Sequence, residues 1–260
     1  MTSAGPLPGA AELLAAISAK QKEFFIVTND ASRTPESCVR VYKERGLTVS
    51  LDRVLSAGVA IGETFREKKL SGATTVVLGT FETSECVRRA GGHVVAINDA
   101  VEYDVLVIGD DSGFDFLPTM NSLLTATHRL LKKSKRPTWL LANPDLLYPR
   151  TNESFAFTSG SVAKFLEIGV RDLHPGADLN FEVLGKPSPL LFNLAMKKSK
   201  VSPSRTVMLG DQLHTDIAGA NRAGIASALL TTGITQLPLA THLPAALQPT
   251  WILQSLSLAR

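Results

Sequence analysis

The chain has 260 residues, of which 44% are hydrophobic, and its formal net charge at neutral pH is +3. This length suggests one large or two small domains with a packed core, and so small a charge gives no argument for nucleic-acid or membrane partners. The chain has no apolar run near the roughly 20 residues of a membrane span, and its N-terminus lacks the basic and apolar regions of a secretory signal.

The two cysteines, Cys38 and Cys86, lie far apart in the sequence. Neither has a histidine or a second cysteine at the spacing that metal ligands require. We therefore expect reduced thiols and a cytoplasmic protein.

The first part of the chain has the pattern helix, strand, helix, strand. Pro8 and apolar residues at helical spacing predict a helix over residues 7–17. A strand over 24–28 follows, the next helix begins near Pro35, and a short strand covers 54–57.

The middle of the chain alternates strands and helices as a self-contained α/β unit. Helices are predicted over residues 60–69, 82–90 and 119–133, and strands over 74–79, 93–97, 105–108 and 138–142. The last of these strands ends in Asn143, Pro144 and Asp145. Polar loop residues at the end of a rigid element often face a ligand, but Asn-Pro also favours a simple turn.

The last part of the chain continues the alternation. Helices are predicted over residues 160–166 and 190–198, strands over 182–184, 206–209 and 226–231, and a final apolar piece over 251–253, after a proline-rich connection around 237–249. A further helix should begin at Thr215 or Asp216, which would cap it, and should stop at Gly224.

Three predicted strand ends carry polar groups: Thr28 and Asn29, then Lys186, then Asp211 with Asp216. The carboxyl ends of parallel strands share one edge of a sheet, so these groups are expected to converge there. A hydroxyl, backbone N–H groups and a lysine suit a phosphate, and two carboxylates suit Mg²⁺. The alternative is that Asp216 only caps its helix, Asp211 only makes a turn, and Lys186 is a surface lysine.

These residues resemble motifs of the haloacid dehalogenase superfamily. Residues 27–29 (Val-Thr-Asn) are similar to its second motif, 185–189 (Gly-Lys-Pro-Ser-Pro) to its third, and 210–220 to its fourth. The middle unit with residues 142–145 resembles the α/β cap of the nitrophenylphosphatase-like branch, class IIA. The resemblance runs from about residue 6 to residue 233.

The resemblance implies a Mg²⁺-dependent phosphatase that acts on a small phosphorylated metabolite. It implies an α/β fold, with a Rossmann-like parallel-sheet core of residues 1–57 plus 181–260 and an inserted cap of residues 58–180. It also implies that Thr28, Asn29 and Lys186 bind phosphate. Asp211 would bind Mg²⁺ directly, and Asp216 would support the metal site from behind Asp211 without touching the ion. Asn143 and Asp145 would face the substrate from the cap, and the cap is where a homodimer would form.

One family motif has no counterpart in the chain. The first motif is a central strand that ends in an aspartate nucleophile, and no aspartate precedes Asp30 here. Losing a central strand would expose two rows of unpaired backbone groups, which is a severe defect. We therefore expect that the sequence starts too late, after this strand, and that the protein is inactive as written. The alternatives are a non-catalytic phosphometabolite binder, and a doubly wound domain whose polar strand ends are only caps.

Overall fold

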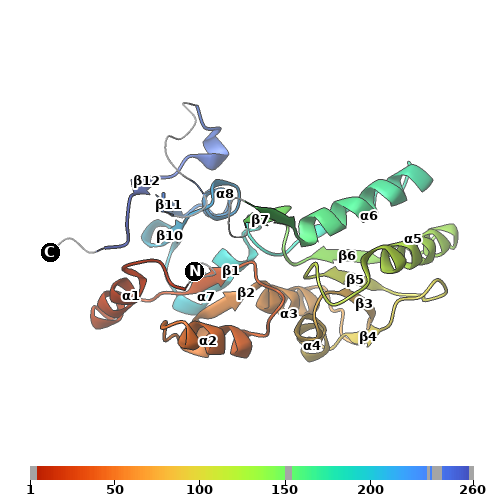
Figure 1. Ribbon diagram of the computed structural model, residues 1–260, viewed down its shortest axis with the longest axis horizontal. Coiled ribbons are helices and arrows are strands. Elements are labelled where there is room, and N and C mark those ends of the chain that lie inside the picture. Colours follow the sequence, from red (N-terminus) through yellow and green to blue (C-terminus); the bar gives the residue numbers. More distant parts are fainter. Residues whose placement is uncertain (1–4, 150–153, 233–234, 236–241, 258–260) are drawn as a thin grey trace. The chain divides into compact units, whose positions relative to one another are not determined.

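The computed structural model describes residues 5–149, 154–232, 235 and 242–257 (Figure 1). The chain divides into two compact units. The first unit comprises Met1–Val27, Pro35–Leu55 and Lys186–Arg260, and the second comprises Thr28–Thr34 and Ser56–Gly185.

The second unit is built on a parallel sheet of five strands in the order β4-β3-β5-β6-β9. The strands are β3 (Thr74–Leu78), β4 (His93–Val95), β5 (Val105–Ile108), β6 (Thr138–Leu141) and β9 (Glu182–Val183). The sequence of β5 is Val-Leu-Val-Ile, and all four side chains are buried. A strand covered on both faces is typically a continuous hydrophobic run, which explains why β5 takes the middle position.

Helices cover both faces of this sheet. They are α3 (Ala57–Glu67), α4 (Phe81–Arg89), α5 (Phe116–Lys132) and α6 (Ser159–Leu173). In Figure 1, α5 and α6 run along one face, and α3 and α4 lie on the other. Ile108, Leu123, Trp139 and Leu166 belong to the buried cluster between the layers. Burying each such side chain stabilises the fold by about 1.5–3 kcal/mol. The sheet is therefore firmly packed, and the loops that follow its strands start from a rigid base.

The first unit contains two separate sheets. One consists of β1 (Ile26–Thr28) and β2 (Val54–Ser56), whose last residues belong to the second unit. The other is parallel, with β10 (Val207–Gly210), β11 (Ala226–Leu230) and β12 (Trp251–Leu253) side by side. The helices are α1 (Ala10–Ala19), α2 (Pro35–Glu44), α7 (Leu190–Ser199) and α8 (Ala218–Arg222), and the short 3-10 turns are Leu51–Arg53, Pro203–Arg205 and Ala245–Leu247.

Each of the two sheets has its own hydrophobic cluster. Cys38, Tyr42 and Val54 pack together beside β1 and β2, whereas Phe192 and Ile225 pack on the side of β10 and β11. Among the described residues, no ladder of hydrogen bonds joins β1 to β10. In the part of the first unit that the structure describes, these two clusters are distinct from each other.

The predicted α/β fold with parallel sheets is confirmed, the strand predicted over 105–108 has those bounds, and the final apolar piece over 251–253 is a strand, β12. The helix predicted over 160–166 was too short: α6 runs to Leu173 because buried Val162, Leu166 and Val170 continue its apolar stripe. The predictions missed an antiparallel pair, β7 (Leu147–Pro149) and β8 (Phe155–Phe157). Residues 237–241 of the predicted connection lie outside the described part of the chain.

Two further points concern the predictions for the whole chain. In the part of the chain that the structure describes, no helix is both long and apolar enough to cross a membrane. Cys38 and Cys86 are both buried, and in the described part of the chain they do not form a disulfide. The boundaries predicted for core and cap stay a prediction.

Candidate active site

A buried ion pair joins two of the predicted site residues within the first unit. The ammonium nitrogen of Lys186 lies 2.7 Å from Oδ1 of Asp216, and the two side chains are only 12% and 4% exposed. Lys186 also donates a hydrogen bond of 3.1 Å to the carbonyl oxygen of Val27. Lys186 is therefore fixed from two sides, and it is not the surface lysine of the alternative interpretation.

The second oxygen of Asp216 holds the loop that carries Asp211. Oδ2 accepts hydrogen bonds from the backbone N–H of Asp211 at 3.0 Å and of Gln212 at 3.1 Å. Gly210 makes this approach possible, because a Cβ atom there would lie 2.3 Å from the Asp216 carboxyl group. Asp216 thus positions the end of β10.

The prediction that Thr215 or Asp216 caps the following helix was wrong. The turn after β10 is a π-helix over Leu213–Ile217, and α8 follows directly with no side-chain cap. The Asp216 side chain turns back toward β10 because Lys186 and two backbone N–H groups offer it three charge-assisted hydrogen bonds there.

The donor groups around Asp211 fit a magnesium ion that takes one carboxylate and keeps several waters. Both oxygens of Asp216 are engaged by Lys186 and the backbone, so Asp211 is the carboxylate that would hold the metal. Among the described residues, no group of three or more His, Cys, Asp or Glu side chains is arranged around a metal position. Mg²⁺ commonly takes one or two carboxylates and keeps several waters, so Asp211 with waters is a sufficient set.

The loop after β1, residues 28–34, belongs to the second unit and is tightly turned. The backbone N–H of Asp30 donates to Oγ1 of Thr28 at 3.2 Å. Asp30 accepts from the N–H of Ser32 at 2.9 Å and pairs with Arg33 at 2.6 Å. Asn29 is buried. These contacts hold Thr28 and Asn29, the predicted phosphate-binding residues, at the start of a rigid turn.

The first turn of α4 fastens the same loop from the other side. Thr80 and Thr83 donate through their hydroxyls to the carbonyl oxygens of Ser32 at 2.7 Å and of Ala31 at 2.8 Å. Glu82 accepts from the backbone N–H of Thr34 at 2.7 Å. Three side chains from the start of α4 therefore satisfy three backbone groups of the loop.

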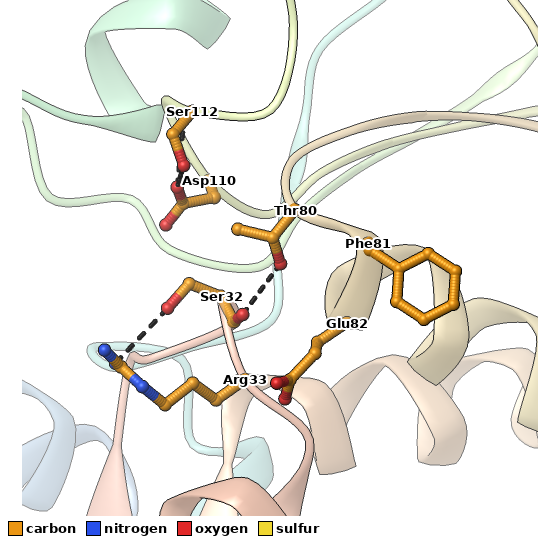
Figure 2. A pocket seen from close by; sticks show the side chains of 7 residues that line it. All are labelled: Ser32, Arg33, Thr80, Phe81, Glu82, Asp110 and Ser112. Atoms are coloured by element: carbon orange, nitrogen blue, oxygen red, sulfur yellow. Dashed lines mark hydrogen bonds between the residues drawn. The ribbon is translucent and has the colours of Figure 1, made fainter.

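A pocket of about 480 Å³ lies beside this junction, within the second unit. Its lining residues come from the 28–34 loop and from the ends of β3 and β5: Ser32, Arg33, Thr80, Phe81, Glu82, Asp110 and Ser112. In Figure 2, Asp110 and Ser112 lie across the pocket from Ser32 and Arg33. The sequence prediction missed all of them. The signal was present, since Thr80 and Asp110 each follow a glycine at the end of an apolar strand.

The loop after β6 forms a turn within the second unit. The backbone N–H of Asp145 donates to Oδ1 of Asn143 at 3.0 Å, which is the turn that Asn-Pro favours. The carbonyl oxygen of Asp145 accepts from the N–H of Gly160, so the loop lies against the start of α6. A role of Asn143 and Asp145 toward substrate stays a prediction.

The structure thus joins Lys186, Asp216 and the loop of Asp211 in one unit, and places Thr28 and Asn29 in the other. The convergence of Thr28 and Lys186 on one phosphate stays a prediction.

Two family models match the chain. The HAD-hydrolase-like model matches residues 183–259, and the haloacid dehalogenase-like hydrolase model matches residues 1–93. Among characterised proteins, the dihydroxyacetone phosphatase of Corynebacterium glutamicum is 25% identical over 228 residues, covering 88% of this chain and 76% of that protein. The acid sugar phosphatase of Staphylococcus haemolyticus is 24% identical, with 88% of this chain and 80% of that protein covered.

Solved structures agree with these matches. A possible sugar phosphatase of the HAD superfamily from Cytophaga hutchinsonii is 30% identical, with a TM-score of 0.78 and coverage of 98% of this chain and 90% of that chain. The glycerol phosphate phosphatase of Mycobacterium tuberculosis, solved in complex with magnesium, is 25% identical. Its TM-score is 0.81, and the match covers 97% of this chain and 70% of that chain.

Proposed function

Because the chain belongs to the haloacid dehalogenase superfamily, among the nitrophenylphosphatases and sugar phosphatases of class IIA, we propose that it is a phosphatase for a small phosphorylated metabolite. The observation that carries the proposal is the buried pair of Lys186 and Asp216, which fixes an ammonium group and the loop of Asp211 together. Positioned charges of this kind supply most of the catalysis in phosphoryl transfer.

Each side chain has a role in this proposal. Lys186 and the groups of Thr28 and Asn29 neutralise and orient the phosphate. Asp211 holds Mg²⁺, and Asp216 keeps both Lys186 and the Asp211 backbone in place. When bound, the metal would supply positive charge beside the phosphate oxygens. Asn143 and Asp145 are proposed to face the substrate from the cap, which we place at residues 58–180 between the two parts of the core.

Whether this 260-residue chain can hydrolyse a substrate depends on the catalytic nucleophile. In the family, it is an aspartate before the first helix, and no aspartate precedes Asp30 in these 260 residues. We expect negligible hydrolysis of p-nitrophenyl phosphate with Mg²⁺, because loss of a catalytic nucleophile costs several orders of magnitude in rate. A chain extended at its N-terminus by an apolar strand ending in Asp should hydrolyse the ester, and Asp→Asn at that position should abolish turnover.

The competing proposal is a non-catalytic protein that binds phosphorylated metabolites. It predicts Mg²⁺-linked binding of phosphate or vanadate with no turnover in either chain. If neither chain hydrolyses the ester or binds vanadate, both proposals are wrong. If Lys186→Ala leaves the rate of ester hydrolysis unchanged, Lys186 does not bind the phosphate as proposed.

Location and assembly complete the proposal. We propose a cytoplasmic protein, on the basis of its cysteine content, and a homodimer that forms through the cap. Sedimentation equilibrium of the chain at several concentrations tests the dimer, and a single monomeric species at all of them would rule it out.

A further inference from the structure

We propose that the first turn of α4 positions the phosphate-binding loop, with Thr83 as the principal positioning residue. The Thr83 hydroxyl holds the backbone that presents Thr28 and Asn29. This inference rests on the proposed function, in which those two residues bind the phosphate. It adds a side chain that never touches the phosphate and lies 52 positions along the chain from its partner, Ala31.

The placement of the Thr28 hydroxyl depends on the backbone that follows it. Its oxygen accepts the backbone N–H of Asp30 at 3.2 Å. Since a hydroxyl has one hydrogen and two lone pairs, this contact fixes the oxygen and leaves the hydrogen for a phosphate oxygen. The direction of the Asp30 N–H is set by the path of the chain through Asp30 and Ala31. A shift of that path would therefore move the Thr28 hydroxyl.

Thr83 fixes this path from outside the loop. Its hydroxyl donates to the carbonyl oxygen of Ala31 at 2.8 Å, and its side chain is fully buried. Gly79 and Gly109 follow β3 and β5 and pack closely against it. A Cβ atom at Gly79 would lie 2.7 Å from the Thr83 hydroxyl oxygen, and one at Gly109 would lie 2.4 Å from its methyl carbon. The ends of two sheet strands thus determine where the hydroxyl points.

Two neighbours of Thr83 hold the later backbone groups of the loop. The Thr80 hydroxyl donates to the carbonyl oxygen of Ser32 at 2.7 Å, which Figure 2 marks with a dashed line. The Glu82 carboxylate accepts the backbone N–H of Thr34 at 2.7 Å. Both groups lie farther along the chain from the phosphate-binding residues than the Ala31 carbonyl does. Thr83 is therefore the contact of this turn that bears most directly on phosphate.

Removing the Thr83 hydroxyl would release the Ala31 carbonyl. Thr83→Val keeps the shape of the side chain and deletes its donor. A buried carbonyl that loses its donor costs free energy unless the backbone turns to find another one. Such a turn would move the Asp30 N–H, and the Thr28 hydroxyl with it. A hydroxyl with a merely structural role would instead lower stability and leave the phosphate affinity of the folded protein unchanged.

The test measures binding of inorganic phosphate by calorimetry, with Mg²⁺ present, to the 260-residue chain and to three variants. Thr83→Val should weaken phosphate about tenfold, since small displacements of binding groups cost factors of this order or more. Thr83→Ser keeps the donor and should retain the affinity, although it loses a buried methyl group. Thr127→Val is the matched control, because Thr127 is equally buried and donates to the carbonyl oxygen of Leu123 at 2.7 Å. It should lower stability and leave phosphate binding unchanged.

The comparison separates this inference from the proposed function. If the unmodified chain binds phosphate and Thr83→Val binds it equally well, the inference is overturned and the proposed function stands. Equal losses in Thr83→Val and Thr83→Ser, or in Thr83→Val and Thr127→Val, would overturn it in the same way. An unmodified chain that does not bind phosphate would overturn the proposed phosphate site and the inference together.

A folding defect in Thr83→Val would be visible by circular dichroism, and Glu82→Ala then takes its place. Glu82 is only partly buried, and its carboxylate holds the Thr34 N–H of the same loop. Glu82→Ala should weaken phosphate binding, whereas Glu82→Gln, which keeps an acceptor oxygen, should not. Unchanged phosphate affinity in a folded Glu82→Ala would overturn the inference.

Discussion

The ammonium nitrogen of Lys186 lies 2.7 Å from a carboxylate oxygen of Asp216, although 30 positions separate the two residues. Lys186 follows β9, and Asp216 lies in the turn after β10. The pair therefore ties the third and fourth family motifs together, and several of our predictions depend on it.

Removing one partner of this pair should be costly. Asp216→Asn removes the carboxylate from a buried ion pair with Lys186, and breaking a buried pair typically lowers the free energy of unfolding by about 3–5 kcal/mol. Urea denaturation measures the loss. Glu102→Gln is the control, because it breaks two ion pairs, with Lys133 and Lys135, that are well exposed, and it should change stability far less. Equal losses for the two variants would contradict the prediction.

Gly210 should tolerate no side chain. In Gly210→Ala, the new Cβ would lie 2.3 Å from the Asp216 carboxyl group, and overpacking of this kind typically costs about 1–3 kcal/mol. Gly62→Ala is the matched control, since nothing lies within 4 Å of its Cβ position in α3. That change should stabilise the helix by up to about 1 kcal/mol. Thermal unfolding of both variants gives the comparison, and a neutral Gly210→Ala would rule out the observed approach of Asp216.

The carboxylate of Asp211 should dominate magnesium binding. Asp211→Asn is expected to lower the affinity for Mg²⁺ about tenfold or more in a calorimetric titration. Replacing even a residue that only hydrogen-bonds to a metal ligand typically lowers metal affinity 10–100-fold. Asp178→Asn removes an acid from an exposed loop and should leave the affinity unchanged. If the two variants behave alike, Asp211 has no special role.

Tyr103 should make stability fall at alkaline pH. Burial raises the pKa of its hydroxyl to about 12 from the ordinary value of 10.0, and the hydroxyl lies 2.6 Å from that of Thr127. Because the folded pKa is the higher one, this contribution to stability is complete below pH 10 and is lost as the pH rises toward 12. Urea denaturation across this range should show the loss, and Tyr103→Phe should reduce it. A Tyr103 that ionises near pH 10 in an absorbance titration would contradict this prediction.

The sequence by itself determined the local structure and the family. The apolar run over Val105–Ile108 predicts a buried strand, and the spacing of apolar residues predicts the helices, because both depend on neighbours in the chain. Lys186 and Asp211 were identified at strand ends from the same reasoning. Boundaries were less certain: α6 was cut short, and the three-residue strands β7 and β8 are too brief to show a period.

Only the tertiary structure decided what the polar side chains contact. Asp216 had two possible partners, the N-terminus of its own helix and a lysine far away in the sequence. Packing placed Lys186 within hydrogen-bond distance of its carboxylate. The pocket depends on the order of the strands, since β3 and β5 are neighbours and bring Thr80 and Asp110 to the same edge. Periodicity along the chain carries no information about which strands lie side by side, because that choice is made by the burial of whole faces, and burial is a property of the packed sheet.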